Sequence, residues 1–406
     1  MTPRTLVFLA IATLLFTAGA IVVNSESPAF NHSTGGGLLF PGFAGKINDA
    51  AKIVIESSGK KFTIERKGAN WVVADKYGFP AKYDLVKGTL VALAQLRTLD
   101  AKTSQPSLYP RLEVSDPSSK DAKSSEITVE DAKGAVLASL ILGKTRMPLG
   151  GESNATEIYV RKPSEARSWL ATGNLQRNDD IKTWMARDIV TLDSNRVQSV
   201  AVTPTAAEAK SLAAKAAGAK TPAPVDDRAY TLVKAKPGDG DFTLEQVPAD
   251  EKVKSSFDVN QIGEALSALI ADDVLPAKDL APDATLLRTL DYKSFDGAVI
   301  DLSLYRQGDK TWIKIAAGVE PKVAAEAART KAESKAGTKM PAKAPAAADE
   351  SGSTKLETPF QVADDMQALA ARAKDWLFAL NGSDLSTLEK SFSDLVEAKE
   401  AAKPKS

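Results

Sequence analysis

"DAKGAVLASLIL", Asp131–Leu142, returns in outline later in the chain as "SFDGAVIDLSLY", Ser294–Tyr305. In both stretches a polar residue precedes a glycine, Gly134 or Gly297, and apolar side chains then alternate with others. Glycine is favoured in such turns because it adopts a positive φ without steric penalty, and alternation is typical of a half-buried strand. The two stretches therefore predict the same turn and strand twice, as expected of a duplicated domain.

The first half of the chain alternates between strand patterns and helix patterns. Apolar residues recur every three or four positions within residues 83–99, which is typical of an amphipathic helix that covers a sheet, and Asp84 is expected as its N-cap. Two short helices are expected at residues 164–176 and 181–189. Alternating residues bounded by turn signals predict strands at residues 52–57, 60–67, 68–75, 125–143 (a hairpin) and 157–163.

The second half repeats this order of elements. A helix is expected at residues 257–273, where Asp258 and Gln261 approximate a capping box, and residues 375–396 echo residues 168–190. Four matched elements in one order are better explained by duplication than by coincidence. The further strands of this half are expected at residues 229–247 and 286–305, which are hairpins, and at residues 310–318.

These patterns predict an α+β fold with a tandem repeat. We expect an N-terminal transmembrane helix followed by two copies, residues 46–198 and 199–396, of a mainly antiparallel sheet covered by helices. Two segments rich in Ala and Lys interrupt the second copy, at residues 206–227 and 321–357, and a tail of residues 397–406 is similar. They hold few large apolar side chains, so surface excursions are expected, with partner-binding arms as the alternative interpretation.

The N-terminus is apolar enough to cross a bilayer. Residues 5–23 carry no charge, and a helix of that length spans roughly 28 Å. We expect residues 1–24 to be a membrane anchor and residues 25–45 a spacer. A cleaved signal peptide is the alternative, because residues 18–20 ("AGA") resemble a cleavage site. Arg4 precedes the span, so the N-terminus is expected in the cytoplasm and the rest of the chain on the other side.

Composition excludes several classes of function. The 406 residues hold 52 Lys and Arg and 52 Asp and Glu, so no net charge is present to attract nucleic acid over long range. There is no cysteine, and His32 is the one histidine. Thiol chemistry, disulfides, thiolate zinc sites and serine–histidine pairs are therefore excluded. His32 lies in a Gly-rich polar run and is expected to be an ordinary linker residue.

Short motifs that suggest catalysis or metal binding have a simpler interpretation. Ser57 and Ser58 stand three residues before Lys60 and Lys61, the S-x-x-K spacing of some hydrolases. That chemistry needs a helix start, whereas these residues are expected to connect two strands. Residues 239–241 ("DGD") begin like a calcium loop but lack its later ligand and its glycine, so a hairpin is expected there.

The remaining candidates are common features of globular proteins. Carboxylate pairs occur at Glu130 with Asp131 and at Asp272 with Asp273, and nothing in the sequence aims them at one another. The five tryptophans lie within strand or helix patterns and are expected to anchor the core. We therefore expect no catalytic, cofactor-binding or metal-binding residue and no cofactor.

Several motifs carry a family resemblance. Together with the apolar N-terminus, they resemble the bacterial membrane-anchored family known as domain of unknown function 4340, over nearly the whole chain except the Ala/Lys-rich insertions. The resemblance implies that ABC-type transport or gliding-motility auxiliary components are partners, and it brings no catalytic residue with it. The motifs are "LLFPGF" (38–43), "INDAAKIVI" (47–55), "FTIERKGANWVV" (62–73), "DAKGAVLASLILG" (131–143), "YVRKPSEARSWLATGNL" (159–175) and "WMARDIV" (184–190).

The sequence thus predicts a non-enzymatic accessory or scaffold protein. It is expected in a bacterial inner membrane as a single-pass protein, with lipid around the N-terminal helix, the bulk of the chain in the periplasm, and an ABC-type or gliding-motility-like system as its partner. The alternative is an envelope binding module that recognises a glycan or peptide in a cleft between the two repeats, because clefts between domains are common ligand sites.

Overall fold

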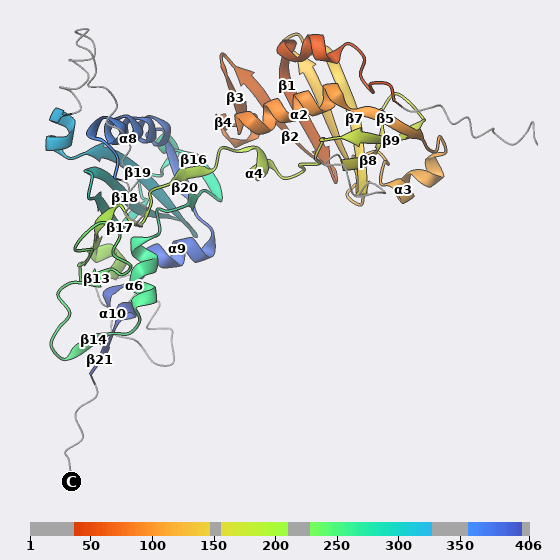
Figure 1. Ribbon diagram of the computed structural model, residues 1–406. Coiled ribbons are helices and arrows are strands. Elements are labelled where there is room, and N and C mark those ends of the chain that lie inside the picture. The colour runs from red at the N-terminus through yellow and green to blue at the C-terminus, as the bar shows by residue number, and fades with distance from the viewer. Residues whose placement is uncertain (1–35, 147–155, 210–227, 327–355, 400–406) are drawn as a thin grey trace, which may run out of the picture. The chain divides into compact units, whose positions relative to one another are not determined.

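The computed structural model describes residues 36–146, 156–209, 228–326 and 356–399. It divides the chain into two compact units: the described residues up to Asp75 with Pro80–Trp184, and Lys76–Phe79 with the described residues from Met185 onward. Each unit combines a large antiparallel sheet with helices, which confirms the α+β class (Figure 1). The expected span within residues 1–24 lies outside the described residues. Within the four described ranges, no helix is long and apolar enough to cross a membrane.

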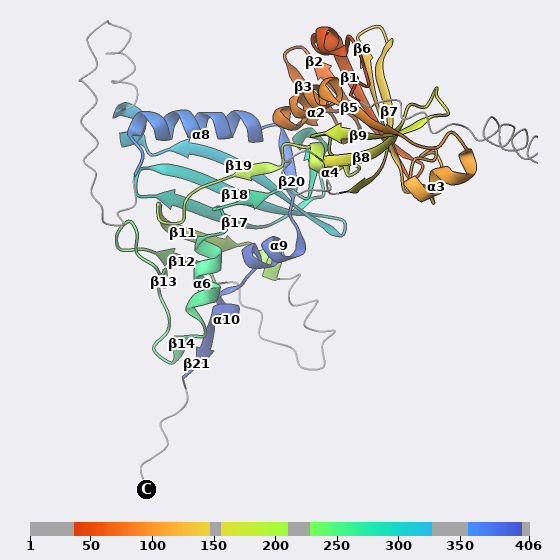
Figure 2. The ribbon, with the colours of Figure 1, turned by 45° about the vertical axis from the view of Figure 1, so that its right-hand side comes forward.

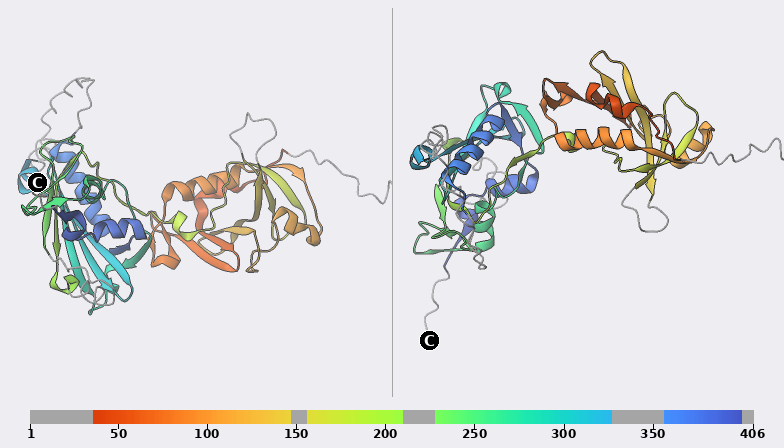
Figure 3. Two further views of the ribbon diagram at one scale, coloured as in Figure 1. Left: turned by 90° about the horizontal axis from the view of Figure 1, so that it is seen from below. Right: turned by 45° about the horizontal axis from the view of Figure 1, so that its top comes forward.

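The first sheet has nine strands, in the spatial order β4-β3-β2-β1-β6-β7-β8-β9-β5. One helix of 13 residues, α2 (Tyr83–Gln95), is the longest in this unit and is the orange helix of Figure 3. The strands are β1 (Ala50–Ser57), β2 (Lys60–Lys67), β3 (Asn70–Val73), β4 (Phe79–Pro80), β5 (Arg97–Ala101), β6 (Ser125–Asp131), β7 (Val136–Arg146), β8 (Thr156–Arg161) and β9 (Ser168–Gly173). The shorter helices are η1 (Phe43–Asp49), η2 (Ala74–Lys76), η3 (Pro106–Leu108), α3 (Tyr109–Leu112) and α4 (Ile181–Trp184).

Side-chain alternation builds the core of this unit, as the sequence predicts. Ile53 of β1 lies opposite Ile64 of β2 and Val129 of β6, and all three are fully buried. The turn between β6 and β7 contains Gly134 at φ 82°, and Asp131 Oδ1 accepts hydrogen bonds from the amides of the turn at 2.8 and 2.9 Å. These backbone hydrogen bonds also lower the pKa of Asp131.

Four predictions for the first half of the chain are wrong. The helix expected at residues 181–189 is limited to α4, which ends at Trp184, and residues 188–190 form strand β10 (Asp188–Val190). Residues 164–176 were expected to be helical, but β9 occupies Ser168–Gly173 because it hydrogen-bonds to β8 on one side and β5 on the other. Sheet pairing decides its conformation, since its apolar residues, 169–171, are consecutive and do not alternate. Helix α2 ends at Gln95 rather than at residue 99, since the following residues form β5. Its N-cap is Lys82 without a side-chain cap, and Asp84 lies in the first turn.

The second sheet has eight strands, in the order β13-β12-β11-β17-β18-β19-β20-β16. Helix α8 (Pro359–Ala373) begins with a full capping box between Thr358 and Gln361, and it lies along β19 and β18 (Figure 2). The sheet contains β11 (Val197–Pro204), β12 (Tyr230–Val233), β13 (Thr243–Leu244), β16 (Asp273–Pro276), β17 (Thr285–Ser294), β18 (Ala298–Gln307), β19 (Lys310–Val319) and β20 (Trp376–Ala379).

Smaller elements complete the second unit. Helix α6 (Ser256–Gly263) contacts β11 and α9 (Gly382–Leu388), and the hydroxyl of Tyr292 in β17 donates to Ile262 O at 2.8 Å. β21 includes residues 397 and 398, the first two residues of the expected tail. The remaining elements are the strand pairs β10 (Asp188–Val190) with β15 (Leu269–Ile270) and β14 (Glu251–Val253) with β21 (Val396–Ala398), and the helices η4 (Ala277–Asp279) and α10 (Phe392–Leu395).

The two sheets have the same strand order when each is read in its own chain order. From β3 to β5 the first sheet gives β3-β2-β1-β6-β7-β8-β9-β5, and the second gives β13-β12-β11-β17-β18-β19-β20-β16. In both, the third strand along the chain is followed by a helix, α2 or α6, before the strand that forms the far edge. Gly134 and Gly297 lie at equivalent positions in two similar turns. In each turn the glycine amide donates to the carbonyl oxygen of the residue three positions earlier, at 3.1 Å.

The predictions for α6 were less accurate. The helix covers eight residues, ends at Gly263 rather than at residue 273, and has Ser255 as its N-cap. The expected capping box of Asp258 and Gln261 is wrong, because both side chains instead contact the ammonium group of Lys390. That contact comes from a segment more than a hundred residues away, which no local pattern contains.

Each sheet has one buried face, and its other face is only partly open. Tyr109 and Val114 pack against Ile141 on that face in the first unit, and Trp312, Leu377 and Ala379 form a buried cluster there in the second. Along β18, Ile300, Leu302 and Leu304 are buried, whereas the residues between them are half-exposed. β6 alternates in the same way, with Ile127 and Val129 buried. The partly open faces carry short and charged side chains, including Glu126, Thr128 and Thr63 in the first unit and Asp291, Asp301 and Ser303 in the second.

Asp291 and Asp301 lie directly opposite each other on β17 and β18. Burial raises the pKa of Asp301, the charge of Asp291 raises it further, and Lys293 opposes the shift. A carboxyl whose pKa is raised by folding destabilises the fold above that pKa, and this destabilisation is relieved as the pH falls through it. We expect Asp291→Asn to raise the free energy of unfolding by about 0.5 kcal/mol at pH 7.

Urea unfolding at pH 7 and pH 4 measures this gain, which should shrink at the lower pH. Asp283→Asn is the control, since Asp283 is exposed and lies outside the sheet. An equal gain from both substitutions, or a gain independent of pH, would contradict the assignment of the effect to the Asp291–Asp301 pair.

Candidate functional site

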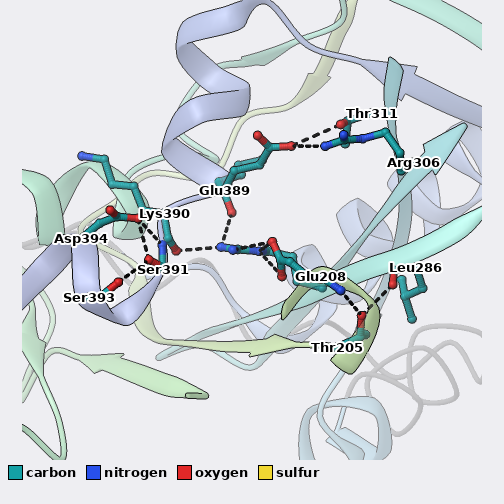
Figure 4. Close-up of polar contacts among 12 residues, drawn as sticks. Thr205, Glu208, Leu286, Arg306, Thr311, Glu389, Lys390, Ser391, Ser393 and Asp394 are labelled. Atoms are coloured by element: carbon teal, nitrogen blue, oxygen red, sulfur yellow. Dashed lines mark hydrogen bonds and ion pairs between the residues drawn. The ribbon is translucent and has the colours of Figure 1, made fainter. Parts of the chain in front are cut away.

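A buried ion pair of the second unit joins strand β17 to the start of the first insertion. Glu208 follows Thr205, whose hydroxyl donates to Leu286 O at 2.7 Å, and residues 206–209 are helical (Figure 4). The Glu208 carboxylate accepts hydrogen bonds from Arg288 of β17, with Nη2 at 2.6 Å and Nε at 2.9 Å. Their side chains are 6% and 2% exposed. We call this pair the first clamp.

The first clamp also holds the far end of the same insertion. Arg288 Nη1 donates to Lys390 O at 2.7 Å and to Leu388 O at 3.1 Å. Tyr230, which lies just after the insertion, donates its hydroxyl to the same Lys390 carbonyl at 2.7 Å. Burial raises the pKa of Tyr230, so the phenol stays protonated and remains a donor. The Lys390 carbonyl therefore links the two described ends of the insertion, because it accepts from Tyr230 directly and from Arg288, which in turn binds Glu208.

Glu389 precedes Lys390 in the loop between α9 and α10, and its side chain is acidic. Its Oε1 accepts a hydrogen bond from Thr311 Oγ1 of β19 at 3.2 Å and lies 3.6 Å from Arg306 Nη2 of β18 (Figure 4). Ser391 and Asp394 form a capping box at the start of α10. The loop that joins α9 and α10 is thus attached to the end of the sheet by its backbone and by a carboxylate.

A second clamp closes the other insertion. Arg196 binds Glu357 through two hydrogen bonds, Nη1 to Oε1 at 2.7 Å and Nη2 to Oε2 at 3.0 Å, and its Nε donates to Asp296 Oδ2 at 2.8 Å. Ser294 Oγ donates to the other oxygen of Asp296 at 2.5 Å. Burial raises the pKa of Glu357 and the Arg196 charge opposes that shift. Asp296 and Ser294 belong to the turn between β17 and β18.

The start of this insertion reaches the same turn. Glu320 N donates to Gly297 O at 2.9 Å, and residues 321–326 are helical. Gly297 has φ 91°, and a Cβ at this position would collide with the side chain of Val323. The β17–β18 turn therefore lies between the two described ends of the insertion, with Val323 on one side and Glu357 on the other.

These groups form clamps and not an acid–base centre. The Glu208 carboxylate and the Arg288 guanidinium are buried and saturated by each other and by backbone carbonyls, so no accessible lone pair or proton remains for a substrate. Pairing offsets the high cost of burying each charge. What the clamps do is fix where each Ala/Lys-rich insertion leaves and re-enters the fold. The expectation of surface excursions is therefore wrong for Glu208, which belongs to the core.

The residues singled out in the sequence are not brought together into a catalytic site. Ser57 Oγ contacts Ser124 O and Asp179 Oδ2, each at 3.4 Å, and Ser58 Oγ donates to Ala122 O at 3.1 Å. Lys61 pairs with Glu56 at 3.3 Å. Both serines lie at the connection between β1 and β2, as predicted. His32 lies outside the described residues.

The acidic candidates have separate structural partners. Asp239 accepts from Lys236 N at 3.1 Å, and Asp241 Oδ1 accepts from Asn260 Nδ2 at 2.6 Å. Glu130 pairs with Lys52 at 3.1 Å, and Asp273 pairs with Lys310 at 3.1 Å. Within the described ranges, no three His, Cys, Asp or Glu side chains gather as metal ligands would.

The tryptophans mostly serve the core. Trp71, Trp184 and Trp312 are buried, and Trp184 Nε1 donates to Asn178 O at 3.0 Å. Trp169 and Trp376 are half-buried, and no tryptophan lies fully exposed. The prediction of core anchors is confirmed for the three buried side chains.

The two clamps were not predicted, because the residues of each ion pair lie far apart in the sequence. Arg288 gives one local signal, a charged residue inside the apolar strand "LLRTLDY", but nothing in the sequence names its partner. Glu208 lies in a segment whose composition is typical of a solvated chain. A buried arginine requires a carboxylate nearby, and that requirement could have prompted a search for one.

We expect Arg288→Met to destabilise the second unit by about 3–5 kcal/mol, because Glu208 is left as an uncompensated buried charge. The double variant Arg288→Met with Glu208→Leu should recover much of that loss. Chemical denaturation of the two variants measures both effects. Lys252→Met is the matched control, since Lys252 and Glu397 are 52% and 49% exposed and such pairs contribute at most about 1 kcal/mol. Equal effects of Arg288→Met and Lys252→Met would contradict the assignment.

Comparison with protein families gives a match to this chain. The profile described as "Domain of unknown function (DUF4340)" matches residues 71–286, more than half of the chain and parts of both units. A search among curated proteins found no match. The family match agrees with the resemblance carried by the motifs of the first half. The chain belongs to the DUF4340 family.

Proposed function

We propose that this protein is a non-enzymatic accessory or scaffold protein of the bacterial envelope. Residues 1–24 anchor it in the inner membrane, the bulk of the chain lies in the periplasm, and its partner is an ABC-type transport or gliding-motility-like auxiliary system. The observation that carries this proposal is the open part of one face in each sheet, along β6 and β18, where one side of the strand is buried and the other is half-exposed. Such a face offers a broad surface to another protein.

The polar chemistry of the chain also supports a binding role. The side chains considered above as catalytic candidates have structural partners: Ser57 contacts Asp179, Lys61 pairs with Glu56, and Glu208 pairs with Arg288. The uncharged run of residues 5–23 supports the location in a membrane. Two clamps hold Glu208 and Glu357, which lie at the described ends of the Ala/Lys-rich insertions.

We further propose that the two units are copies of one ancestral domain. The equal strand orders, the shared place of α2 and α6, and the matching turns at Gly134 and Gly297 support this proposal. The insertions then arose in the second copy, between β11 and β12 and between β19 and α8. A scaffold with two related units can contact two sites of a partner at once, which raises avidity without any new type of contact.

Affinity purification of the tagged full chain from native membranes in detergent tests the scaffold role. We expect ABC-type or related auxiliary membrane proteins to co-purify. Ser303→Arg, on the partly open face of the second sheet, should lower their recovery, because a bulky charge there blocks close contact. Asp283→Arg in an exposed turn is the control. Repeated recovery of no transport or auxiliary component would overturn the proposal.

Separate expression of the two units tests the duplication. If each is a copy of a complete domain, residues 36–184 and residues 185–399 should each fold alone and unfold cooperatively in urea. Circular dichroism and a sigmoidal denaturation curve measure this. Cooperative folding of the second unit with a disordered first unit, or the reverse, would contradict it.

A further inference from the structure

The first unit contains a cavity of about 520 Å³ at one end of its sheet. Its size is within the range of small ligand pockets. β7 has an irregular register here: Leu142 lies opposite Val160, but Thr145 lies opposite Ile158, so β7 has one extra residue. Bulges of this kind are frequent beside binding sites. The lining side chains come from Glu113, Lys144, Thr145, Thr156, Gln176 and Arg177, with Gly143 and Leu175.

Several side chains that line the cavity carry hydrogen-bond donors that have no partner among the described residues. Lys144 forms no ion pair with any residue in the described ranges, and the hydroxyls of Thr145 and Thr156 make no hydrogen bond there. Arg177 uses Nε on Asp179 and Nη1 on Lys123 O, which leaves Nη2 unpaired within the same ranges. Glu113 is the one acid among the lining residues, and Arg177 is already paired with Asp179 at 2.5 Å, so Lys144 is the lining cation that has no ion pair within the described ranges.

The second unit shows what occupies the corresponding end of its sheet. Ser125 lies six residues before Asp131 and pairs with Leu142, just as Arg288 lies six residues before Ser294 and pairs with Leu304. Leu142 and Leu304 are therefore equivalent positions, and they lie opposite Val160 of β8 and Ile313 of β19. Two residues before these partners, Ile158 lies opposite Thr145 and Thr311 lies opposite Arg306. Thr145 of β7 thus corresponds to Arg306 of β18.

The segments that follow β9 and β20 differ between the two units. After β9, residues 174–180 form no helix, and Leu175, Gln176 and Arg177 line the cavity. After β20, the chain forms α9 and carries Glu389 to Arg306 and Thr311. At this end of the sheet, the second unit therefore contains the Glu389 carboxylate in contact with Arg306 and Thr311. The first unit contains a cavity lined by Glu113 and by Lys144, Thr145 and Thr156, whose side chains make no ion pair or hydrogen bond with the described residues.

We propose that the cavity of the first unit binds a carboxylate side chain of a partner polypeptide, in the position that Glu389 takes in the second unit. The inference rests on the proposed duplication and deepens the scaffold role by naming what the partner presents. Lys144 and the free Nη2 of Arg177 supply charge, and Thr145 and Thr156 supply neutral donors. Charge-assisted hydrogen bonds to a carboxylate are the strong ones in proteins. A polypeptide is the occupant because a glutamate on a chain segment fills the matching place.

Binding of hexaglutamate to the full chain tests this proposal, with hexaglutamine as the uncharged probe. Isothermal titration should give one site for hexaglutamate, weakened by salt, and no binding of hexaglutamine. Lys144→Ala should weaken binding at least tenfold. Lys133→Ala removes the same charge at the opposite end of the β6–β7 hairpin and should leave the affinity unchanged. Gln176→Glu places a carboxylate in the cavity and should abolish binding while the urea midpoint is retained.

Several outcomes would overturn the proposal. These are no binding of hexaglutamate, equal weakening by Lys144→Ala and Lys133→Ala, and displacement of the peptide by equimolar inorganic phosphate, which would assign the cavity to small anions. Separate expression of the units tests the duplication by another measurement. If hexaglutamate binding depends on Lys144 but the separate units do not fold, the duplication is overturned. The assignment of the cavity as a carboxylate site would then still stand.

Discussion

A guanidinium removed from water must be fully paired, and this requirement organises the second unit around Arg288. The arginine belongs to a sheet strand, yet its partners come from two other segments: Glu208 at the start of an insertion, and the carbonyls of Leu388 and Lys390 near the end of the chain. The low dielectric that makes an unpaired charge costly also makes these contacts strong. One side chain thereby joins segments that are about a hundred residues apart in sequence.

Local patterns predicted most of the sheet. Where a strand has one buried face, as in β1, β2, β6 and β18, the alternation of side chains is visible in the sequence and the turn glycines mark its ends. β9 shows where this fails. Its apolar residues, 169–171, are consecutive and do not show the alternation of a half-buried strand, so only its pairing with β8 and β5 decides the conformation. The prediction of the start of α6 failed for a related reason. Asp258 and Gln261 have the spacing of a capping box, but their side chains bind Lys390, which lies in a distant loop.

The polar sites were far less predictable than the sheet. A sequence shows that Arg288 is a charge in an apolar strand, but the identity of Glu208 as its partner depends on the tertiary fold. The cavity near Lys144 is harder still, since it results from a one-residue bulge and from a loop that does not fold into a helix. Comparison of the two sheets supplied the missing information, because one unit shows a carboxylate where the other has donors that have no partner among the described residues.

The turn between β17 and β18 has a consequence for how this chain can vary. Its glycine backbone accommodates Val323, and its aspartate binds the arginine that holds Glu357, so both ends of the second insertion are fixed at a single hairpin. A loop with fixed ends becomes only about 0.6 kcal/mol costlier each time its length doubles. Residues can therefore be gained or lost between these ends with little effect on the sheet. Natural variation in the length of this protein should concentrate in that interval, while the hairpin that closes it changes slowly.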